Sequence, residues 1–334
     1  KSSVNYIRMK LGGIIQSGNT VRSGVALTGQ GRALTLRPNP RGEAAMKHLV
    51  IGLAVLALAA CEENARVQAT VVPELTKEVA AVKLFAIDCG RFHVKDAAMF
   101  SDEHAYDGKA RDLVDPCYLV RHQRGDLIWD AGISPALAAA PAEKGATETV
   151  TQKETLEQQL AELGVAPADI DYFSISHSHY DHVGNAALFA GATWIVDKDE
   201  RDWMFRDEAR KEPDFSNYAA LESAKTKLIE GDGDYDVFGD GSAIIVQAPG
   251  HTPGHAVLLL TTARSGKVLL TGDMWHLAEA RKKRTVPAFN FNREQTLASM
   301  DKVEALARDN NARLVRQHVP EDVAALPAFP APLE

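Results

Sequence analysis

Positive charge is scarce over most of this chain. The 334 residues carry a formal net charge of −8, although the first sixty carry +7, with eight Lys and Arg residues against one Glu. The remaining residues therefore carry −15. So acidic a surface excludes nucleic-acid binding through a broad basic face. With 45% apolar residues the chain can still bury a large core, and one domain of about 250 residues is enough to explain it.

Long apolar runs are also lacking. The run over 49–58 is well short of the about 20 residues that a transmembrane helix needs, so a membrane-spanning helix is disfavoured. The run follows Lys47 and ends in Ala59-Ala60-Cys61, which is typical of a signal peptide and resembles a bacterial lipobox. We therefore expect a lipoprotein signal peptide over 46–60 and a lipid on Cys61 as the only membrane attachment. The protein would be exported, either periplasmic or membrane-anchored.

The segments around this signal predict little structure. Residues 1–45 are rich in Gly, Arg and Ser and have no apolar periodicity. We expect them to be disordered or to be an upstream extension that the natural protein lacks. Residues 61–79 are expected to form a linker, and residues 80–330 the folded domain.

Cysteine is scarce too, with three in the chain. If Cys61 carries a lipid, Cys89 and Cys117 remain, and an exported location permits a disulfide between them. Both lie in apolar, strand-like runs, where a buried free thiol is the commoner outcome. The sequence therefore favours two free thiols and leaves their pairing open.

Histidine and aspartate, in contrast, are concentrated in one place. The segment HSHYDH over 177–182 follows a short apolar run and packs four metal-ligand side chains into six residues. Buried imidazoles and carboxylates are costly without partners, and a divalent metal removes that cost. In extended chain alternate residues point the same way, so His177 and His179 can face one ion while Asp181 and His182 turn toward a second. The segment therefore predicts two metals.

Three later segments supply what a two-metal site still needs: PGHTPGH over 249–255, TGD over 271–273, and QH over 317–318. Each follows an apolar run typical of a strand, over 243–246, 267–270 and 312–315. We therefore expect His251, Asp273 and His318 to lie at strand ends.

These four segments, in this order, resemble the metallo-β-lactamase superfamily. The resemblance implies an α/β fold, the αββα sandwich, in which two mixed β-sheets are flanked by helices, and it makes 80–330 a hydrolase domain. By analogy with the family motif, one ion would be held by His177, His179 and His251, and the other by Asp181, His182 and His318. Asp273 would bridge both. The two divalent ions are expected to be Zn, with Mn, Fe or Co as alternatives.

The other histidines are expected to lie outside the metal centre. We interpret His48, His93, His104 and His122 as ordinary surface or core residues. His255, the second His of the 249–255 loop, is expected to pack or hydrogen-bond beside the metals.

Two ions bridged by a carboxylate suit hydrolysis. Metal binding lowers the pKa of water from 15.7 to about 7, which gives a bridging hydroxide nucleophile at neutral pH, and one ion polarises the carbonyl that it attacks. The resemblance implies that Asp181 accepts the proton of this hydroxide and returns it to the leaving group.

Within the superfamily the chain is most similar to the N-acyl-homoserine lactonase family. The similarity covers about 80–325 and includes, besides the metal motifs, KLF at 83–85 through Cys89-Gly90, CYLV at 117–120 with DAG at 130–132, and VPAF at 286–289. It implies a small-molecule lactone or ester as substrate. One position departs from the family: three residues after Asp273, where the family has a Tyr that holds the substrate carbonyl, this chain has His276. Its imidazole can still donate a hydrogen bond to an oxyanion, so we expect a catalytic role for it.

For the substrate pocket we expect apolar side chains near the ligand loops, with core packing as the alternative interpretation. The candidates are Met99, Trp275, Phe289 and Phe291. The oligomeric state stays open, with a homodimer as one option.

Other activities stay open as well. A His after the bridging Asp also resembles organophosphate-hydrolysing relatives, so a phosphotriesterase-like hydrolase is an alternative. A thioester hydrolase is disfavoured because few residues follow His318, and a true β-lactamase because such enzymes usually lack a bridging Asp. From another class, a non-catalytic metal-binding lipoprotein is possible, although it would not need Asp181 and Asp273 together.

Apolar spacing and end signals predict the other elements. Strands are expected over 82–87, 117–120, 127–132 and 172–176. Helices are expected over 154–163, ended by Gly164, over 183–189, and from Asn292 onward, with Leu297, Met300, Val303 and Leu306 on one face. The basic run over 281–284 is expected to be a solvated loop.

Overall fold

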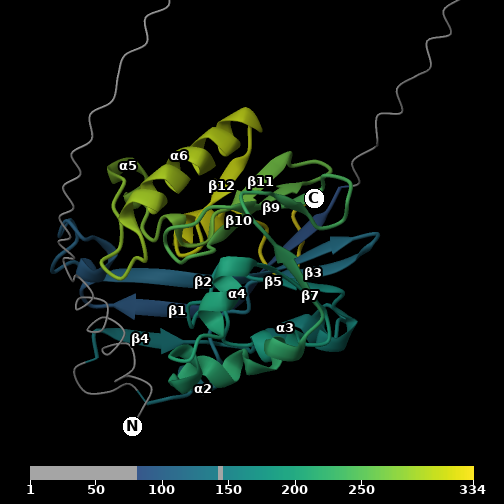
Figure 1. Ribbon diagram of the computed structural model, residues 1–334, viewed down its shortest axis with the longest axis horizontal. Helices are drawn as coiled ribbons and strands as arrows, with labels where there is room; N and C mark the ends of the chain where they lie inside the picture. The colour runs from purple at the N-terminus through teal and green to yellow at the C-terminus, as the bar shows by residue number, and fades with distance from the viewer. Residues whose placement is uncertain (1–80, 142–145) are drawn as a thin grey trace, which may run out of the picture. The chain divides into compact units, whose positions relative to one another are not determined.

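The computed structural model describes residues 81–141 and 146–334. The predictions for 1–45, for the signal peptide over 46–60, for the lipid on Cys61, for the linker over 61–79 and for His48 lie outside these residues. Within them, two β-sheets pack face to face (Figure 1).

The larger sheet is mixed and has seven strands in the order β4-β1-β2-β3-β5-β6-β7. β4, β1, β2 and β3 pair antiparallel, whereas β3, β5, β6 and β7 pair parallel. The strands are β1 Lys83–Val94, β2 Arg111–His122, β3 Gly125–Trp129, β4 Glu148–Thr151, β5 Tyr172–Ser174, β6 Thr193–Asp197 and β7 Thr226–Ile229.

The smaller sheet is also mixed and has five strands in the order β12-β11-β10-β9-β8. Among the described residues, β11 and β12 form its only parallel pair, and the other neighbouring strands pair antiparallel. The strands are β8 Tyr235–Asp236, β9 Ala243–Gln247, β10 Ala256–Thr261, β11 Lys267–Leu270 and β12 Arg313–Val315.

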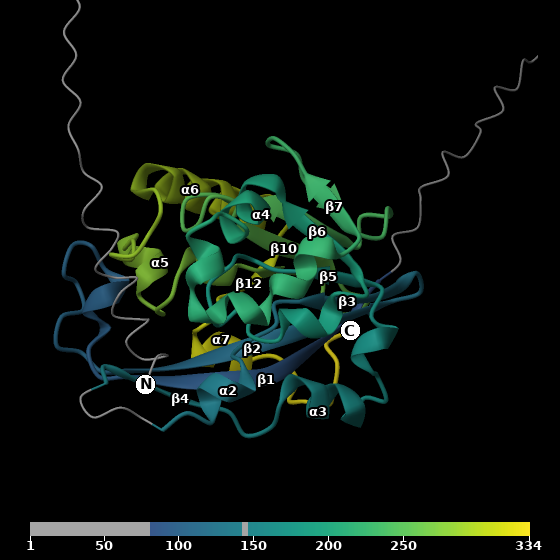
Figure 2. The same ribbon diagram turned by 60° about the horizontal axis from the view of Figure 1, so that its bottom comes forward.

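Helices cover the outer faces of both sheets. Figure 2 shows α6 and α5 on one side of the stacked sheets and α3 on the other. The α-helices are α2 Pro135–Ala138, α3 Leu156–Glu162, α4 Lys198–Met204, α5 Ala280–Lys283, α6 Arg293–Asp309 and α7 Pro320–Ala324. Single 3-10 turns are η2 Ala97–Phe100, η3 Pro167–Asp169, η4 Ala186–Phe189, η5 Ala209–Lys211, η6 Pro213–Asn217, η7 Ala219–Ser223 and η8 Gly272–Met274. No helix among the described residues has the length and apolar character to cross a membrane.

The alternation of side chains along the strands produces the layers. Leu84, Val120 and Leu127 of the larger sheet meet Leu258 and Leu270 of the smaller one in the interior between the sheets. Intervening residues face outward and are covered by helices.

On the larger sheet, Ile87, Leu119 and Ile128 pack with Leu156 and Leu160 of α3. On the smaller sheet, Leu259 and Leu269 pack with Met300 and Val303 of α6. The predicted αββα sandwich is therefore confirmed.

Two helices begin where their cap residues predict. Thr155 and Gln158 form a capping box at the start of α3, and the chain leaves the helix through Gly164 at φ +68°. The Asn292 side chain accepts a hydrogen bond from the Gln295 N–H at the start of α6.

The helix expected over 183–189 is wrong. Only the single turn η4 forms there, because the N–H groups of Gly184 and Asn185 donate to the carbonyls of Gly132 and Ala131 rather than to the preceding turn. Gly184 also lies so close to this backbone that a Cβ would fall 2.2 Å from the Ser134 nitrogen. This segment is shaped by its contact with the 131–134 turn.

The loop expected over 281–284 is wrong, although 282–284 are exposed as expected. Ala280–Lys283 forms the short helix α5, and Arg284 ends it. Two guanidinium groups pair with carboxylates of α6: Arg281 with Glu304 at 2.6 Å and Arg284 with Asp301 at 2.6 Å. These ion pairs hold α5 against α6, and the basic run alone does not predict them.

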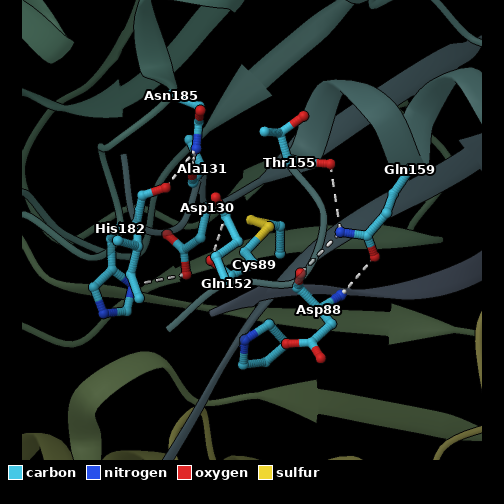
Figure 3. The surroundings of a disulfide bond; sticks show 12 residues. Asp88, Cys89, Asp130, Ala131, Gln152, Thr155, Gln159, His182 and Asn185 are labelled. Carbon is cyan, nitrogen blue, oxygen red and sulfur yellow. Dashed lines mark hydrogen bonds and ion pairs between the residues drawn. A yellow bond between two sulfur atoms is a disulfide. The ribbon is translucent and has the colours of Figure 1, made fainter. Parts of the chain in front are cut away.

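The expectation of free thiols is also wrong, because a disulfide joins Cys89 of β1 to Cys117 of β2 (Figure 3). The strand register places Ile87 opposite Cys117, and a register shift between Asp88 and Arg91 turns Cys89 toward it. The two Cα atoms lie 5.7 Å apart, within the usual range for a disulfide of about 4.4–6.8 Å. The pairing depends on this irregularity, which the residue pattern does not show.

Candidate metal centre

Seven ligand candidates converge at one edge of the sandwich. They follow the carboxyl ends of four strands: the 177–182 segment follows β5, His251 follows β9, Asp273 follows β11, and His318 follows β12. The prediction that these residues lie beyond strand ends is confirmed.

The first ligand group comprises His177, His179, His251 and Asp273. His179 Nδ1 lies 2.9 Å from His177 Nε2 and 3.1 Å from His251 Nε2. Asp273 Oδ2 lies 3.5 Å from His177 Nε2 and 3.4 Å from His251 Nε2. Three imidazole nitrogens and one carboxylate oxygen thus face a common point.

The second ligand group comprises Asp181, His182 and His318. His318 Nε2 lies 3.7 Å from Asp181 Oδ2, and His182 Nε2 lies 3.9 Å from Asp181 Oδ1. The other oxygen of Asp273, Oδ1, lies 2.9 Å from His318 Nε2 and 3.3 Å from His182 Nε2. Asp273 therefore presents one oxygen to each group, as a bridging carboxylate would.

Three of the imidazoles have a neighbour that fixes which ring nitrogen faces the centre. Nδ1 lies 2.9 Å from the Val114 carbonyl in His318, 3.1 Å from Asp130 Oδ2 in His182, and 3.4 Å from Asn290 Oδ1 in His251. These oxygens can only accept, so each Nδ1 carries a hydrogen and each Nε2 faces the centre, where a metal would replace any proton on it. Such neighbours orient histidine metal ligands in proteins.

Asp130, directly after β3, contacts the 177–182 segment at both ends, through the preceding Ser176 and through His182. Its Oδ1 accepts the Ser176 N–H at 2.6 Å, and its backbone adopts φ +60°, which is uncommon for a residue with a side chain. The next residue, Ala131, donates its N–H to the His182 carbonyl, and its carbonyl accepts from the Asn185 side chain (Figure 3).

Gly132 completes this turn at φ +58° and lies against the disulfide, where a Cβ would fall 2.3 Å from Cys89 Cβ. The disulfide thus borders the turn that orients His182.

His255 is oriented away from ligation, as expected. Its Nδ1 donates to the Ala248 carbonyl at 3.1 Å, and its Nε2 accepts the Asp273 N–H at 3.1 Å. Gly272 makes this contact possible, because a Cβ there, at φ +49°, would lie 2.8 Å from the same Nε2. His255 therefore holds the backbone of Asp273 in place.

Glu200 of α4, which the sequence analysis did not identify, links two ligand loops. Its side chain is buried, with Oε1 accepting the Ser178 N–H at 2.7 Å and Oε2 accepting the Gly254 N–H at 2.9 Å. The sequence around Glu200 shows only a short run of charged residues, and no spacing rule connects Glu200 to residues 178 and 254. Each end of the carboxylate fixes a different loop of the first group.

Burial and neighbouring charges shift the pKa values of the ligand side chains. Burial lowers the pKa of His177 well below its usual value. Burial also acts to lower the pKa of His182 and His318, but the carboxylates outweigh it: the pKa of His182 is well above its usual value and that of His318 is about 9. Burial acts to raise the pKa of Asp273, yet the surrounding imidazoles, His318 first, hold it well below its usual value. Without metal, protons on two imidazoles therefore balance the carboxylates.

Asp115 of β2 is a second residue that the sequence analysis missed. Its carboxyl group is buried, and neither oxygen has a hydrogen-bond partner among the described residues. Burial, reinforced by the charge of Asp181, raises the pKa of Asp115 well above its usual value. A buried carboxyl group without a hydrogen-bond partner among the described residues therefore lies behind the second group.

His276 lies beside the bridging carboxylate, with its Nε2 3.0 Å from Asp273 Oδ2. Burial lowers the pKa of His276 to about 4, so the ring is neutral and carries one N–H at physiological pH. The centroid of the His276 ring lies 5.8 Å from that of His318, in a stacked arrangement, and 5.0 Å from that of Phe100, at a tilt.

The pocket candidates fall in different places. Phe289 lies 5.7 Å from both His179 and His251 and is half-buried, and Met99 is half-buried in the same apolar cluster. Trp275 is buried in the core, which was the alternative interpretation. Phe291 is 51% exposed and contacts Trp203.

The remaining described histidines lie elsewhere, as expected. His93 and His104 pair with the surface residues Asp112 and Asp107. His122 is buried with its Nε2 3.1 Å from Asp240 Oδ2.

The donor set fits divalent metals. Lone pairs of buried imidazoles converge on carboxylate oxygens, and neither His182 Nε2 nor Asp273 Oδ1 has a hydrogen-bond partner among the described residues. Imidazole and carboxylate ligands suit Zn, Mn, Fe and Co.

Comparison with known proteins agrees with this geometry. The family model described as the metallo-beta-lactamase superfamily matches residues 111–318. The chain is 29% identical over 238 residues to N-acyl homoserine lactonase AttM of Azorhizobium caulinodans, which covers 67% of this chain and 87% of that protein. It is 27% identical over 256 residues to N-acyl homoserine lactonase AiiA of Bacillus thuringiensis subsp. kurstaki, with 74% and 97% covered.

A solved structure of an N-acyl homoserine lactone hydrolase, with the product N-hexanoyl-L-homoserine bound at its catalytic metal centre, superposes with a TM-score of 0.64. The two chains are 26% identical, and the match covers 76% of this chain and 100% of the other.

Proposed function

The chain belongs to the metallo-β-lactamase superfamily, and from that premise we propose that this metal-dependent hydrolase opens lactone rings, those of N-acyl-homoserine lactones among them. The observation that carries the proposal is the pair of ligand groups joined through the two oxygens of Asp273. Similarity to N-acyl homoserine lactonases over two thirds of the chain or more supports the choice of a lactone.

We propose two divalent ions, Zn before Mn, Fe or Co. The first would be held by His177, His179 and His251, and the second by Asp181, His182 and His318, with Asp273 shared between them. When bound, such ions lower the pKa of water and polarise an ester carbonyl.

Asp181 would move the proton in this reaction. It belongs to the second group only, and its carboxylate oxygens lie at the edge of the centre, 3.7 and 3.9 Å from their imidazole neighbours. A carboxylate in that position can accept a proton from the attacking water and return it to the ring oxygen as the ester bond breaks.

His276 would stabilise the carbonyl oxygen as negative charge develops. Its Nε2 lies 3.0 Å from Asp273 Oδ2, and if metal ions take up that oxygen, the N–H of the neutral ring becomes available to hydrogen-bond an oxyanion. Phe289 and Met99 would provide the apolar wall for an acyl chain.

A substrate panel tests the proposal: acyl-homoserine lactones, γ- and δ-lactones, a phosphotriester, a thioester and a cephalosporin. We expect lactones to give the highest kcat/KM. Asp273→Ala should lower kcat/KM for them by more than about a hundredfold, because it removes the shared ligand. Preference for the phosphotriester would favour the alternative hydrolase, and no turnover with metal bound would favour a metal-binding protein without catalysis.

We also propose that the protein is exported and anchored by a lipid on Cys61. The Cys89–Cys117 disulfide supports an oxidising compartment. Labelling with a radioactive fatty acid in a bacterial host should mark the protein and leave Cys61→Ser unlabelled, and label retained in that variant would contradict the anchor.

A further inference from the structure

The metal centre reaches solvent on the side of His179 and Tyr180. The other six ligand candidates are buried, whereas His179 and its neighbour Tyr180 are half-buried. Phe289 borders His179 on one side at 5.7 Å. A substrate that approaches His179 from this side therefore has Phe289 and Tyr180 as its neighbours.

The Tyr180 side of this opening carries a polar pair. The Tyr180 hydroxyl donates a hydrogen bond to Glu148 Oε1 at 2.9 Å, and Glu148 lies on the edge strand β4. Phe92 packs edge-on against both Tyr180, at 6.5 Å, and His318, at 5.9 Å. These contacts fix the Tyr180–Glu148 pair beside the second ligand group.

The pair offers hydrogen-bond acceptors and no free donor. The hydroxyl hydrogen of Tyr180 is committed to Oε1, so the lone pairs of that hydroxyl and Oε2 of Glu148 remain to accept. Burial raises the pKa of Glu148 to about 7, so the carboxylate form prevails at pH 8. On the other side of His179 lies the half-buried Phe289 ring, which packs edge-on against the buried Phe100. The two sides of the opening thus differ in what they can bind.

We propose that Tyr180 and Glu148 determine substrate specificity by accepting a hydrogen bond from an N–H or O–H donor on the substituent beside the lactone ring. The inference rests on the proposed lactonase function and adds to it the chemical group that is recognised. A lactone whose substituent lacks such a donor leaves the half-buried acceptors unpaired, and sites that hydrogen-bond a substrate N–H or O–H reject the analogue that lacks it.

Two matched substrates test the inference at pH 8. One is N-hexanoyl-homoserine lactone, and the other is α-hexanoyloxy-γ-butyrolactone, in which an oxygen replaces the N–H. The zinc-loaded wild type should prefer the first by about tenfold or more in kcat/KM. Tyr180→Phe and Glu148→Ala should each abolish most of that preference by slowing the first substrate alone. The double variant should behave like either single one, because the two residues act as a unit.

Glu157→Gln, an exposed change on α3, serves as the control and should keep the preference. Metal content is measured for every variant by mass spectrometry. Equal losses on both substrates, an unchanged preference, or loss of metal from either variant would overturn the inference while the lactonase function stands. If the wild type opens neither lactone, the proposed function fails, and this inference fails with it.

Discussion

At the scale of single residues, three of the ligand candidates are held by a group outside the two ligand groups. Val114 holds His318, Asp130 holds His182, and His255 holds the backbone of Asp273. The centre is therefore arranged before any ion arrives. What an ion must displace are the protons on His182 and His318, whose pKa values are raised.

This arrangement predicts proton release on metal binding. At pH 7 both imidazoles are protonated in the metal-free protein, since the pKa of His318 is about 9 and that of His182 is well above its usual value. Titrating zinc into weakly buffered protein with a pH indicator should release roughly two protons per chain. Apparent zinc affinity should rise from pH 6 to pH 9.

The same protons affect the metal-free fold. A histidine whose pKa is raised on folding adds stability that is complete below about pH 6.5 and is lost as pH rises through about 9. Zinc binding without proton release, or affinity that does not change with pH, would contradict the charge state assigned to these imidazoles.

At the scale of elements, the loops that carry the ligand candidates follow strands of both sheets, so their relative position depends on contacts between the loops. Glu200 does this from α4, with one carboxylate oxygen on the 177–182 segment and the other on the 249–255 loop. Gly254 allows the approach, because a Cβ there would lie 2.6 Å from the Glu200 nitrogen.

Glu200→Gln tests this link. The amide keeps the shape but turns an N–H₂ group toward one of the two backbone N–H donors, so that one loop loses its acceptor. We expect zinc affinity to fall by about 10- to 100-fold and the free energy of unfolding by about 1–3 kcal/mol. Chelator competition and denaturant titration measure the two effects.

Asp202→Asn, an exposed change on the same helix, is the matched control and should leave zinc affinity unchanged. A Glu200→Gln protein that binds zinc as tightly as the control would show that the loops do not depend on this carboxylate.

The disulfide provides a second test at this scale. It closes a loop of 28 residues between β1 and β2, for which chain entropy gives a stabilisation of about 3.6 kcal/mol. Reduction should lower the thermal midpoint of the wild type and leave that of a Cys89→Ser, Cys117→Ser double variant unchanged. If reductant has no effect on the wild type, the bond is absent or contributes nothing to stability.

At the scale of the whole molecule, much of the fold and the centre could be predicted because apolar runs and ligand motifs alternate along the chain. The 177–182 segment predicts the right grouping, although the chain turns there, with the His182 N–H donating to the His179 carbonyl, and is not an extended strand. Glu200 and Asp115 could not be found, since their roles depend on tertiary contact. The disulfide and α5 were misjudged for the same reason, because strand register and ion pairs with α6 decide them.

The central claim is a lactonase with two metals per chain, and one titration tests it most directly. Zinc is added stepwise to the metal-free protein while opening of N-hexanoyl-homoserine lactone is followed. The account predicts that the rate reaches its maximum at two zinc ions per chain and that Asp273→Ala gives no comparable rise. A maximum at one ion per chain, or bound zinc without lactone opening, would contradict it.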